Sequence, residues 1–378
     1  MTSRLSVAMD LTPLLSFRTG IGLSVAGMWS ALDAMADGPR LSAYGLGLRN
    51  GSPGPDVPRS LRRIRIPARL AVEAWSRYEY PRIDRWLSPV DVVHTTNYVT
   101  PPSRHPTVMT VNDLSFIYEP PADPVVATFP AMLRRAVARG AHIHVTTRQV
   151  AREVDEMLGP GLIDSGRVSV VAFGIPPIGS RGSADPWVDT LIAGRPYVLF
   201  IGTDEPRKNL PRLVEAFGRV AREVPELALV LAGRETDHTA HTAKAIEALG
   251  PATASRVLRL GVVDDQARAS LLRRARVMAY PSTYEGFGFP VLEAMRAGVP
   301  VVAADVAVLR EVAGGAAVLA DPFDSGSLAA ALRLAATDGP AREALISAGK
   351  DRAATFTWEA TAAGLNALYH RVADAGGR

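Results

Sequence analysis

The stretch Tyr284-Glu-Gly-Phe-Gly-Phe-Pro-Val-Leu-Glu-Ala-Met-Arg-Ala-Gly298 decides the fold of this chain. It follows a short apolar run, 277–280, and is typical of a strand that passes through a tight turn into a helix. Gly286 and Gly288 permit the turn, because glycine has no Cβ to obstruct it, and Pro290 stands where a helix begins. The first N–H groups of a helix have no partner within it and attract anions such as phosphate. The stretch therefore predicts a phosphate-binding strand-to-helix turn in an α/β fold.

Two glutamates flank this turn. Glu285 stands before it and Glu293 lies in the predicted helix, with seven residues between them. Each carboxylate can accept hydrogen bonds from hydroxyl groups of one ligand while the turn holds its phosphates. A sugar nucleotide has hydroxyls at both ends and a diphosphate between them, so the pattern indicates a site for such a molecule. The alternative is a common strand-to-helix turn with Glu293 in a surface ion pair.

A second polar turn follows the apolar run 197–202. There, Arg207 and Lys208 lead into another predicted helix, 210–224. Two cations at a helix start counter the charge that develops on a departing diphosphate. Taken alone, the two residues also fit an ordinary pair of solvated cations.

Short apolar runs alternate with amphipathic stretches along the whole chain, as in doubly wound parallel sheets. The length of 378 residues suits two domains. A stretch rich in Gly, Pro, Ser and Asp, 174–194, is typical of a linker between them. The predicted strands are 5–9, 91–94, 107–111, 142–146, 168–172, 197–202, 227–233, 257–261, 277–280, 299–303 and 317–320. The predicted helices include 21–35, 129–138, 148–157, 210–224 and 358–375.

Composition and motifs exclude several classes of protein. The chain has no cysteine, which excludes disulfides, thiolate nucleophiles and cysteine–zinc sites. Asp10 interrupts the N-terminal apolar stretch too early for a signal peptide, and no run reaches the roughly 18 apolar residues of a membrane span. We therefore expect a cytoplasmic protein. The chain lacks a metal-binding motif, a nucleophile elbow and a Walker lysine, so we expect metal-independent chemistry and neither a serine hydrolase nor an NTPase.

The net charge is only +4, but arginines crowd the segment Arg59–Arg85, together with Trp75, Tyr78, Tyr80 and Trp86. We favour a solvated helix face with its aromatic side chains buried. One alternative is that the protein binds peripherally to the inner face of an anionic membrane. The other is that the segment binds an anionic acceptor. Nucleic acid is not expected as a partner, because no nucleic-acid-binding module accompanies the segment.

The string from Tyr284 to Gly298 resembles the Glu-x7-Glu signature of retaining GT-B glycosyltransferases of glycosyltransferase family 4, also called "glycosyl transferases group 1". That family includes sucrose synthases and bacterial mannosyltransferases, and the chain looks most like the latter. The segment Arg207-Lys208-Asn209 is similar to the one that opens the family's donor domain. The resemblance covers nearly the whole chain; it is strongest over 197–322 and weakest over 38–87.

The resemblance implies the GT-B fold, in which two Rossmann-like, doubly wound parallel-sheet domains face each other across a cleft. It implies an N-terminal acceptor domain over 1–174, a linker over 175–195 and a nucleotide-sugar donor domain over 196–357. A C-terminal helix, 358–378, would return toward the N-terminal domain.

The resemblance also implies roles for individual residues. Glu293 would bind the ribose hydroxyls and Glu285 the donor sugar, while Lys208, supported by Arg207, would meet the charge of the diphosphate. The leaving phosphate itself would take the acceptor's proton, because no general base is evident. Further donor-site residues are Gly286, Phe287, Gly288, Val291 and Leu292 of the turn, Gly202 and Thr203 at a strand end, the base-facing Val262 and Val263, and Gly20 and Gly22 of the loop Thr19-Gly20-Ile21-Gly22.

Asn112 departs from the family's pattern. Relatives usually carry His-Asp-Leu where this chain has Asn112-Asp113-Leu114, and that histidine is held to hydrogen-bond the donor sugar. Asn112 still donates and accepts hydrogen bonds but does not titrate near neutral pH. Thr203 is a second departure, since many relatives carry arginine there. Asn112 and Asp113 remain candidate catalytic residues, whereas a lone histidine at a strand end, such as His94, is more often structural.

The sequence therefore predicts a retaining glycosyltransferase. It would move a hexose from a nucleoside-diphosphate sugar, with GDP-mannose as the first candidate, to a glycan, glycolipid or small-molecule acceptor. The donor is a co-substrate, and no cofactor is expected. Two alternatives stay open. One is a GT-B sugar-nucleotide epimerase, which would need further acid–base residues. The other is a non-catalytic partner that binds sugar nucleotides, for which Asn112 is an argument.

Overall fold

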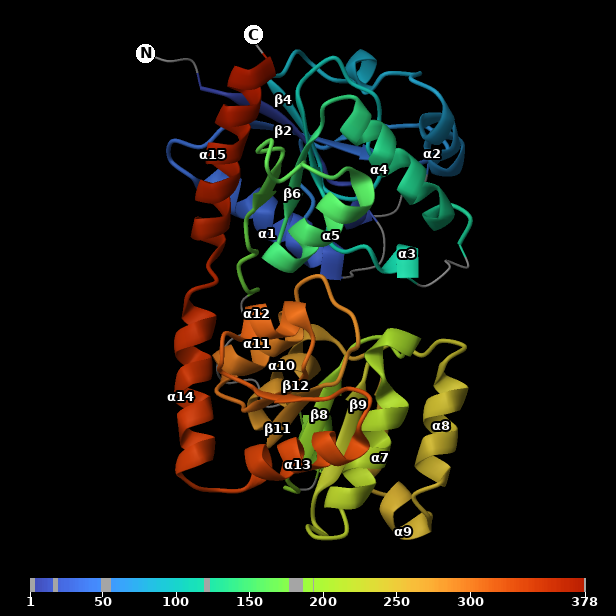
Figure 1. Ribbon diagram of the computed structural model, residues 1–378, viewed down its shortest axis with the longest axis vertical. Coiled ribbons are helices and arrows are strands. Elements are labelled where there is room, and N and C mark those ends of the chain that lie inside the picture. Colours follow the sequence, from blue (N-terminus) through green and yellow to red (C-terminus); the bar gives the residue numbers. More distant parts are fainter. Residues whose placement is uncertain are drawn as a thin grey trace. The chain divides into compact units, whose positions relative to one another are not determined.

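The computed structural model describes residues 4–15, 20–48, 56–118, 123–176, 186–192 and 194–376. Contacts between Cα atoms divide the chain into two compact units. The first unit comprises Met1–Gly174 and Phe356–Arg378, and the second comprises Ile175–Thr355. Each unit has its own parallel sheet (Figure 1). The chain thus leaves the first unit once and returns to it with its last segment.

Within the described residues, the first unit holds a seven-stranded sheet in the order β3-β2-β1-β4-β5-β6-β7. The strands are β1 (Ser6–Asp10), β2 (Arg40–Leu46), β3 (Arg62–Ile64), β4 (Val92–Thr95), β5 (Thr107–Thr110), β6 (His142–Val145) and β7 (Val168–Val170). Every pairing is parallel. The strand order reverses between β1 and β4, and doubly wound sheets bind ligands outside the carboxyl ends of the strands near such a point.

Helices connect these strands. They are α1 (Gly20–Ala34), α2 (Ala68–Arg77), α3 (Ser115–Tyr118), α4 (Phe129–Ala138) and α5 (Arg148–Leu158), with 3-10 turns η1 (Thr12–Leu15), η2 (Ile83–Trp86) and η3 (Val126–Thr128). The C-terminal helix α15 (Trp358–Gly376) packs along α1. Glycines permit the close packing at its start: a Cβ on Gly27 would lie 2.1 Å from the ring of Trp358, and one on Gly174 would lie 2.4 Å from the backbone nitrogen of Trp358. With Leu365 and Tyr369 fully buried, α15 belongs to the core of the first unit.

A buried chain of hydrogen bonds ties α15 to the first sheet. The Tyr369 hydroxyl lies 2.7 Å from His94 Nδ1, and His94 Nε2 lies 2.8 Å from Thr110 Oγ1. Thr110 Oγ1 lies 2.8 Å from His144 Nδ1, and His144 Nε2 donates to the carbonyl of Val171 at 2.9 Å. Burial lowers the pKa of both histidines, so each ring is neutral at neutral pH. Because the Val171 carbonyl only accepts, His144 carries its proton on Nε2, and the donors follow in order: Tyr369 donates to His94, His94 to Thr110 and Thr110 to His144. His94 therefore has the structural role that the sequence favours.

The second unit holds a six-stranded parallel sheet in the order β10-β9-β8-β11-β12-β13 within the described residues. Its strands are β8 (Tyr197–Ile201), β9 (Ala228–Ala232), β10 (Val257–Gly261), β11 (Val277–Tyr280), β12 (Val301–Ala304) and β13 (Val318–Ala320). β8, β9, β11 and β12 are buried at every position. This explains their continuous apolar runs, because a parallel sheet covered on both faces has no exposed side.

The helices of the second unit surround this sheet. They are α6 (Pro186–Ile192), η4 (Pro206–Lys208), α7 (Leu210–Val220), α8 (Thr239–Glu247), α9 (Pro251–Ala254), α10 (Asp265–Arg274), α11 (Phe289–Ala297), α12 (Ala307–Ala313), α13 (Ser325–Ala336) and α14 (Pro340–Ala354). Figure 1 shows α7 and α8 side by side, and α14 packs against α11.

The structure confirms the predicted doubly wound α/β class, and each predicted strand and helix is present with small differences at its ends. Two strands, β2 and β3, were not predicted. β2 is buried only over its second half, and β3 has one buried residue, Ile64, so neither has the continuous apolar run of a central strand. The segment that we predict as a linker, 175–195, includes α6, in which Val188 and Ile192 are buried.

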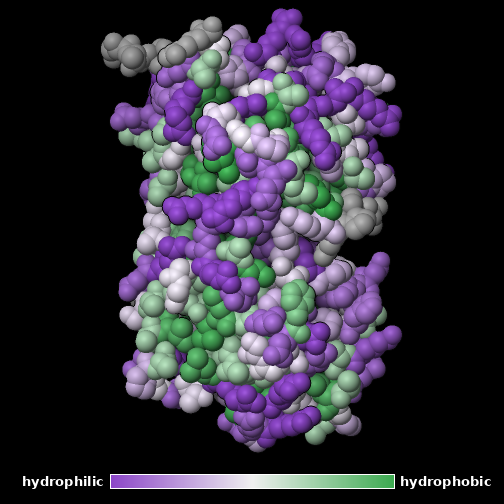
Figure 2. All heavy atoms as spheres, in the orientation of Figure 1, coloured by the Kyte–Doolittle hydropathy of each residue, from purple (hydrophilic) through white to green (hydrophobic). Residues whose placement is uncertain are grey.

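None of the helices in the described ranges is long and apolar enough to cross a membrane. The face drawn in Figure 2 mixes hydrophilic and hydrophobic side chains and has no continuous apolar band.

Candidate functional site

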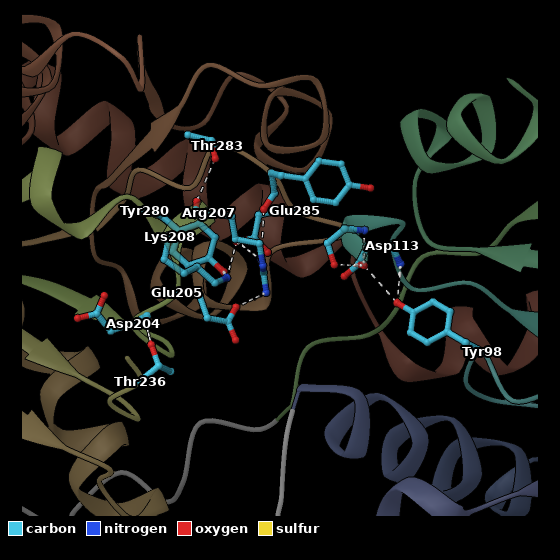
Figure 3. Close-up of polar contacts among 12 residues, drawn as sticks. Tyr98, Asp113, Asp204, Glu205, Arg207, Lys208, Thr236, Tyr280, Thr283 and Glu285 are labelled. Carbon is cyan, nitrogen blue, oxygen red and sulfur yellow. Dashed lines mark hydrogen bonds and ion pairs between the residues drawn. The ribbon is translucent and has the colours of Figure 1, made fainter. Parts of the chain in front are cut away.

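The two polar turns that are predicted to bind the donor lie next to each other at the carboxyl edge of the second sheet. They follow β8 and β11, which pair directly. The amide of Thr283 donates to the carbonyl oxygen of Arg207 at 2.8 Å, and Arg207 Nη1 donates to the carbonyl oxygen of Tyr284 at 3.2 Å. These bonds join the loop that carries Lys208 to the loop that carries Glu285 (Figure 3).

Lys208 and Glu285 meet in a buried polar cluster. Lys208 Nζ donates to the Tyr280 hydroxyl at 2.9 Å and to Glu285 Oε1. Arg207 Nη1 lies 3.3 Å from the same Oε1, and Arg207 Nη2 lies 3.0 Å from Glu205 Oε2. Lys208 is 6% exposed and Glu285 is 7% exposed. We call Arg207, Lys208, Tyr280 and Glu285 the Lys208 cluster.

Opposing effects set the charges in the Lys208 cluster. Burial acts to raise the pKa of Glu285, but Lys208 and Arg207 outweigh burial and hold that pKa below its ordinary value. Glu285 is therefore ionised at neutral pH. Burial, together with the charge of Glu285, raises the pKa of Tyr280 well above its ordinary value, so its hydroxyl keeps its proton. Buried ionisable groups that specific partners perturb in this way are typical of functional sites.

The turn after Glu285 is as tight as the sequence predicts. Gly288, which precedes α11, has a φ of 97°, in the left-handed region that favours glycine. Its neighbours Phe287 and Leu292 are buried. The amide of Val291 donates to the carbonyl oxygen of Gly288 at 3.1 Å. One of the amides that we predict to hold phosphate is thus already bonded within the turn.

Glu293 projects from α11 and is only 1% exposed. Arg268 of α10 forms an ion pair with Glu293 Oε2, and the arginine side chain is 24% exposed. The surface ion pair that was the alternative for Glu293 is therefore wrong, because this carboxylate is inside the protein. The charge of Glu293 also acts on the Lys208 cluster, because it contributes to the raised pKa of Tyr280.

The remaining donor-site candidates lie along the same carboxyl edge, in the loops after β8 and β10. The amide of Gly202 donates to the carbonyl of Ala232, and a Cβ on Gly233 would lie 1.7 Å from the carbonyl oxygen of Gly202. Gly202 and the half-buried Thr203 thus lie against the end of β9. Val262 is 59% exposed and Val263 is half-buried. They follow β10, the edge strand of the sheet, at two strands' distance from β8.

The first unit holds the other candidates. Asn112 follows β5, and its buried Nδ2 has no hydrogen-bond partner in the described structure, which leaves it available to a ligand. Asp113 is engaged locally: its Oδ1 accepts from the Ser115 amide at 3.0 Å, the Ser115 hydroxyl at 2.8 Å and the Tyr98 hydroxyl at 3.2 Å (Figure 3). Asp113 therefore fixes the start of α3, a structural role that competes with the predicted catalytic one.

Gly20 and Gly22 begin α1, and Thr19 lies outside the described residues. A Cβ on Gly20 would meet nothing within 4 Å, whereas Gly22 is buried. Gly20 therefore has open space around it, where a ligand can approach the backbone.

Sequence reasoning missed Tyr280 and Arg268. Tyr280 was taken only as part of an apolar strand, although its position at the carboxyl end of β11 was a usable signal. Arg268 is one of several charged residues in α10, and no sequence pattern marks it.

No group of three or more His, Asp or Glu side chains in the described part of the chain is placed to hold a metal ion.

Comparison with known proteins identifies the family that the second half of the chain matches. Residues 185–352 match the sequence model of the family described as "Glycosyl transferases group 1". Residues 185–352 of the chain belong to this family. The matched residues include Arg207, Lys208, Glu285 and Glu293, so the predicted membership is confirmed.

Curated members of the glycosyl transferases group 1 family match about half of the chain. O-antigen chain mannosyltransferase B of Escherichia coli is 38% identical over 170 residues, 44% of this chain and 44% of that protein. The phosphatidyl-myo-inositol mannosyltransferase of Mycobacterium tuberculosis (strain CDC 1551 / Oshkosh) is 33% identical over 189 residues, 48% of each. The chain therefore spans less than half the length of these relatives in the matched region.

Solved structures resemble nearly the whole chain. Sucrose-phosphate synthase from Thermosynechococcus elongatus has a TM-score of 0.71 at 21% identity and covers 98% of this chain and 100% of its own. Anabaena HepE, solved in complex with UDP and glucose, has a TM-score of 0.68 at 17% identity, with the same coverage. At such identities the likeness concerns the fold, and it confirms the predicted GT-B fold of two Rossmann-like domains.

Proposed function

We propose that this member of the glycosyl transferases group 1 family is a retaining glycosyltransferase that transfers a hexose from a nucleoside-diphosphate sugar. The observation that supports this most is the Lys208 cluster: the buried Lys208 and the half-buried Arg207 at the carboxyl edge of the second sheet, both paired with Glu285. A diphosphate is the partner that this pair of cations suits.

Each group then has a role in the transfer. Lys208 and Arg207 counter the charge of the diphosphate, Glu285 accepts a hydroxyl of the donor sugar, and Glu293 accepts the ribose hydroxyls. Val262 and Val263 contact the base. The bond between the anomeric carbon and the leaving phosphate oxygen breaks as the bond to the acceptor oxygen forms. The acceptor's proton goes to the leaving phosphate, so neither a metal ion nor a protein base is required.

GDP-mannose is our first candidate for the donor, because the curated relatives described above are mannosyltransferases by name. HepE was solved with UDP and glucose, so a uridine nucleotide is the main competitor. The test is a thermal-shift panel of GDP, UDP, ADP and dTDP with their common sugars, run in EDTA. A rise in melting temperature with one base identifies the nucleotide, and no rise with any of them contradicts the donor site.

Asn112 supports one rival, a non-catalytic protein that binds sugar nucleotides. With asparagine where relatives carry histidine, the first unit has lost a titratable group beside the sugar. Incubation with the donor that the panel selects, followed by chromatography, separates the two functions. An enzyme is expected to release free nucleoside diphosphate slowly even without acceptor, whereas a pure binder leaves the donor intact.

We also propose that the acceptor lies at an anionic membrane surface, at the inner face of the cytoplasmic membrane. Trp75 is buried and donates to the Pro81 carbonyl at 2.8 Å, as the solvated-face prediction requires. Leu70, Tyr78 and Tyr80, however, are 63%, 64% and 66% exposed. The same segment has exposed arginines, among them Arg62, Arg65, Arg69, Arg77, Arg82 and Arg85. Exposed apolar side chains among arginines suit the interface of an anionic bilayer.

Vesicle sedimentation tests this second proposal. The protein is expected to bind phosphatidylglycerol vesicles and not phosphatidylcholine vesicles, and Leu70→Gln with Tyr80→Ser should reduce binding severalfold. Leu334→Gln is a matched control, since Leu334 is 50% exposed on α13 of the second unit. Equal binding of vesicles by the double variant and the control would contradict the proposal that this surface binds a membrane.

A further inference from the structure

Tyr280 contacts Lys208 in a way that the proposed reaction does not yet use. It is the last residue of β11 and is 3% exposed. Its ring stacks on Phe200 of the neighbouring strand β8, with centroids 6.3 Å apart and planes 19° apart. Lys208 Nζ lies 2.9 Å from its hydroxyl and 4.9 Å from the centre of its ring. Two paired strands therefore fix the position of this hydroxyl.

An ammonium group has three N–H donors at fixed angles to one another. In this structure, one donates to Glu285 Oε1 and one donates to the Tyr280 hydroxyl. When two of the three directions are fixed by protein groups, the third is fixed as well. Without the second partner, the ammonium group and the flexible stem that carries it would be held by fewer contacts.

We propose that Tyr280 is a positioning residue for Lys208, which sets the direction of the remaining N–H bond toward the donor's diphosphate. The proposal rests on the proposed function, in which Lys208 meets that diphosphate. Tyr280 acts through Lys208 and touches neither the donor nor the acceptor. Its oxygen accepts, so it also stabilises the charged ammonium.

Several charged or titratable groups face this lysine. They are Glu285 from the loop after β11, Arg207 of η4, Glu205 before η4 and Tyr280 of β11, with Glu293 of α11 acting on Tyr280. Burial lowers the pKa of Lys208 from its ordinary value, and Glu285 opposes this effect. Loss of the Tyr280 oxygen removes one acceptor from the charged form. Lys208 is then expected to lose its proton at a lower pH.

The experiment compares Tyr280→Phe with Tyr197→Phe in the whole protein. Tyr197 is a matched control on β8: it is 1% exposed, and its hydroxyl donates to the Leu271 carbonyl at 2.7 Å, away from Lys208. Calorimetry measures the Kd of guanosine and of GDP, or of the pair that the thermal-shift panel selects, from about pH 6 to about pH 10. The Kd of guanosine divided by the Kd of GDP measures how much the diphosphate adds to binding.

Tyr280→Phe is expected to lower this ratio about tenfold at neutral pH and to move its alkaline decline to lower pH. Tyr197→Phe should match the wild type in both respects. Lys208→Met should lower the ratio and abolish its alkaline decline. Phenylalanine keeps the stacking on Phe200, and thermal melting of both Tyr→Phe variants checks their folding.

The outcomes distinguish failure of the proposed function from failure of the positioning role of Tyr280. If Lys208→Met leaves the ratio unchanged, Lys208 does not meet the diphosphate and the proposed function loses its main support. If Lys208→Met lowers the ratio while Tyr280→Phe behaves like Tyr197→Phe, the lysine role stands and the positioning role of Tyr280 is wrong.

Discussion

Glu293 is a carboxylate inside the protein with one hydrogen-bonded side-chain partner, Arg268, among the described residues. A carboxylate can accept further hydrogen bonds, and a ribose offers two hydroxyls. The Arg268 side chain is 24% exposed, so the pair is not sealed from solvent. At the scale of single residues, this pair is the clearest candidate for recognition of the nucleoside.

Glu293→Gln is expected to weaken nucleoside-diphosphate binding about tenfold or more, because hydrogen bonds to a charged acceptor are stronger than those to a neutral one. The loss should largely vanish when the 2′,3′-dideoxy nucleotide is used, since that ligand lacks the hydroxyls. Glu223→Gln is the control, because Glu223 pairs with Arg333 on the surface. Equal affinity of both variants for every nucleotide would exclude Glu293 from the ribose site.

The sequence alone could predict Arg207, Lys208, Glu285 and Glu293 as a set, because all four lie in or just after the turns at two strand ends. It could not predict how they pair. Whether Lys208 meets Glu285 or solvent depends on the pairing of β8 with β11, which lie far apart in sequence. Tyr280 was missed for the same reason, since an apolar run does not show which side chain faces a neighbouring loop.

At the scale of elements, the buried hydrogen-bond chain makes the packing of α15 depend on pH. Burial lowers the pKa of His144 to about 4, and burial also lowers the pKa of His94 well below its ordinary value. Between pH 6.5, the ordinary value, and about pH 4, the unfolded chain binds more protons than the folded one. The contribution of His144 to stability is therefore present above pH 6.5 and is lost as the pH falls toward 4, by roughly 3 kcal/mol at most.

Urea unfolding between pH 4 and pH 8, followed by circular dichroism, checks this expectation on the wild type and His144→Asn. The comparison matters because burial raises the pKa of Asp10 to about 6, which acts in the opposite direction. That effect is common to both proteins and cancels in their difference. A difference in stability that does not change with pH would show that His144 is not the group responsible.

Gly27→Ala is expected to disturb the packing of α15 on α1 and to cost about 1–3 kcal/mol, because the new methyl group would overlap the Trp358 ring. Alanine is otherwise the better helix former, so an effect of this sign cannot come from helix propensity. Gly20→Ala in the same helix is the control, with open space at its Cβ. Equal melting temperatures for the two variants would contradict the close packing.

The sequence predicts the central strands of both sheets but not the strands β2 and β3 at one side of the first sheet. β8, β9 and β11 are apolar at nearly every position because both faces of the sheet are covered. β3 is the edge strand of the first sheet and β2 lies beside it; only the last four residues of β2 and the last residue of β3 are buried. Neither sequence has the apolar run of a central strand, and their pairing, β2 with β1 and β3 with β2, makes them strands.

At the scale of the whole molecule, most of the proposed donor-site residues belong to the second unit, and Asn112, Asp113, Gly20 and Gly22 belong to the first. Hydrogen exchange with mass spectrometry is expected to show that GDP, or the nucleotide that the panel selects, slows exchange after β8 and from β11 into α11. Peptides from β12 and α13, which carry no donor-site candidate, are the internal control. Slower exchange confined to the first unit would place the nucleotide elsewhere.

The return of α15 to the first unit also bears on how the protein is made. Residues 175–355 form a unit that is continuous in sequence, so the ribosome delivers it complete before residues 356–378 emerge. The first unit therefore cannot complete its core until α15 has been translated. Until then, the site beside Gly27 and Gly174 that Trp358 occupies is empty. A premature stop codon within the final helix would damage the amino-terminal half of the protein and spare the half translated just before it.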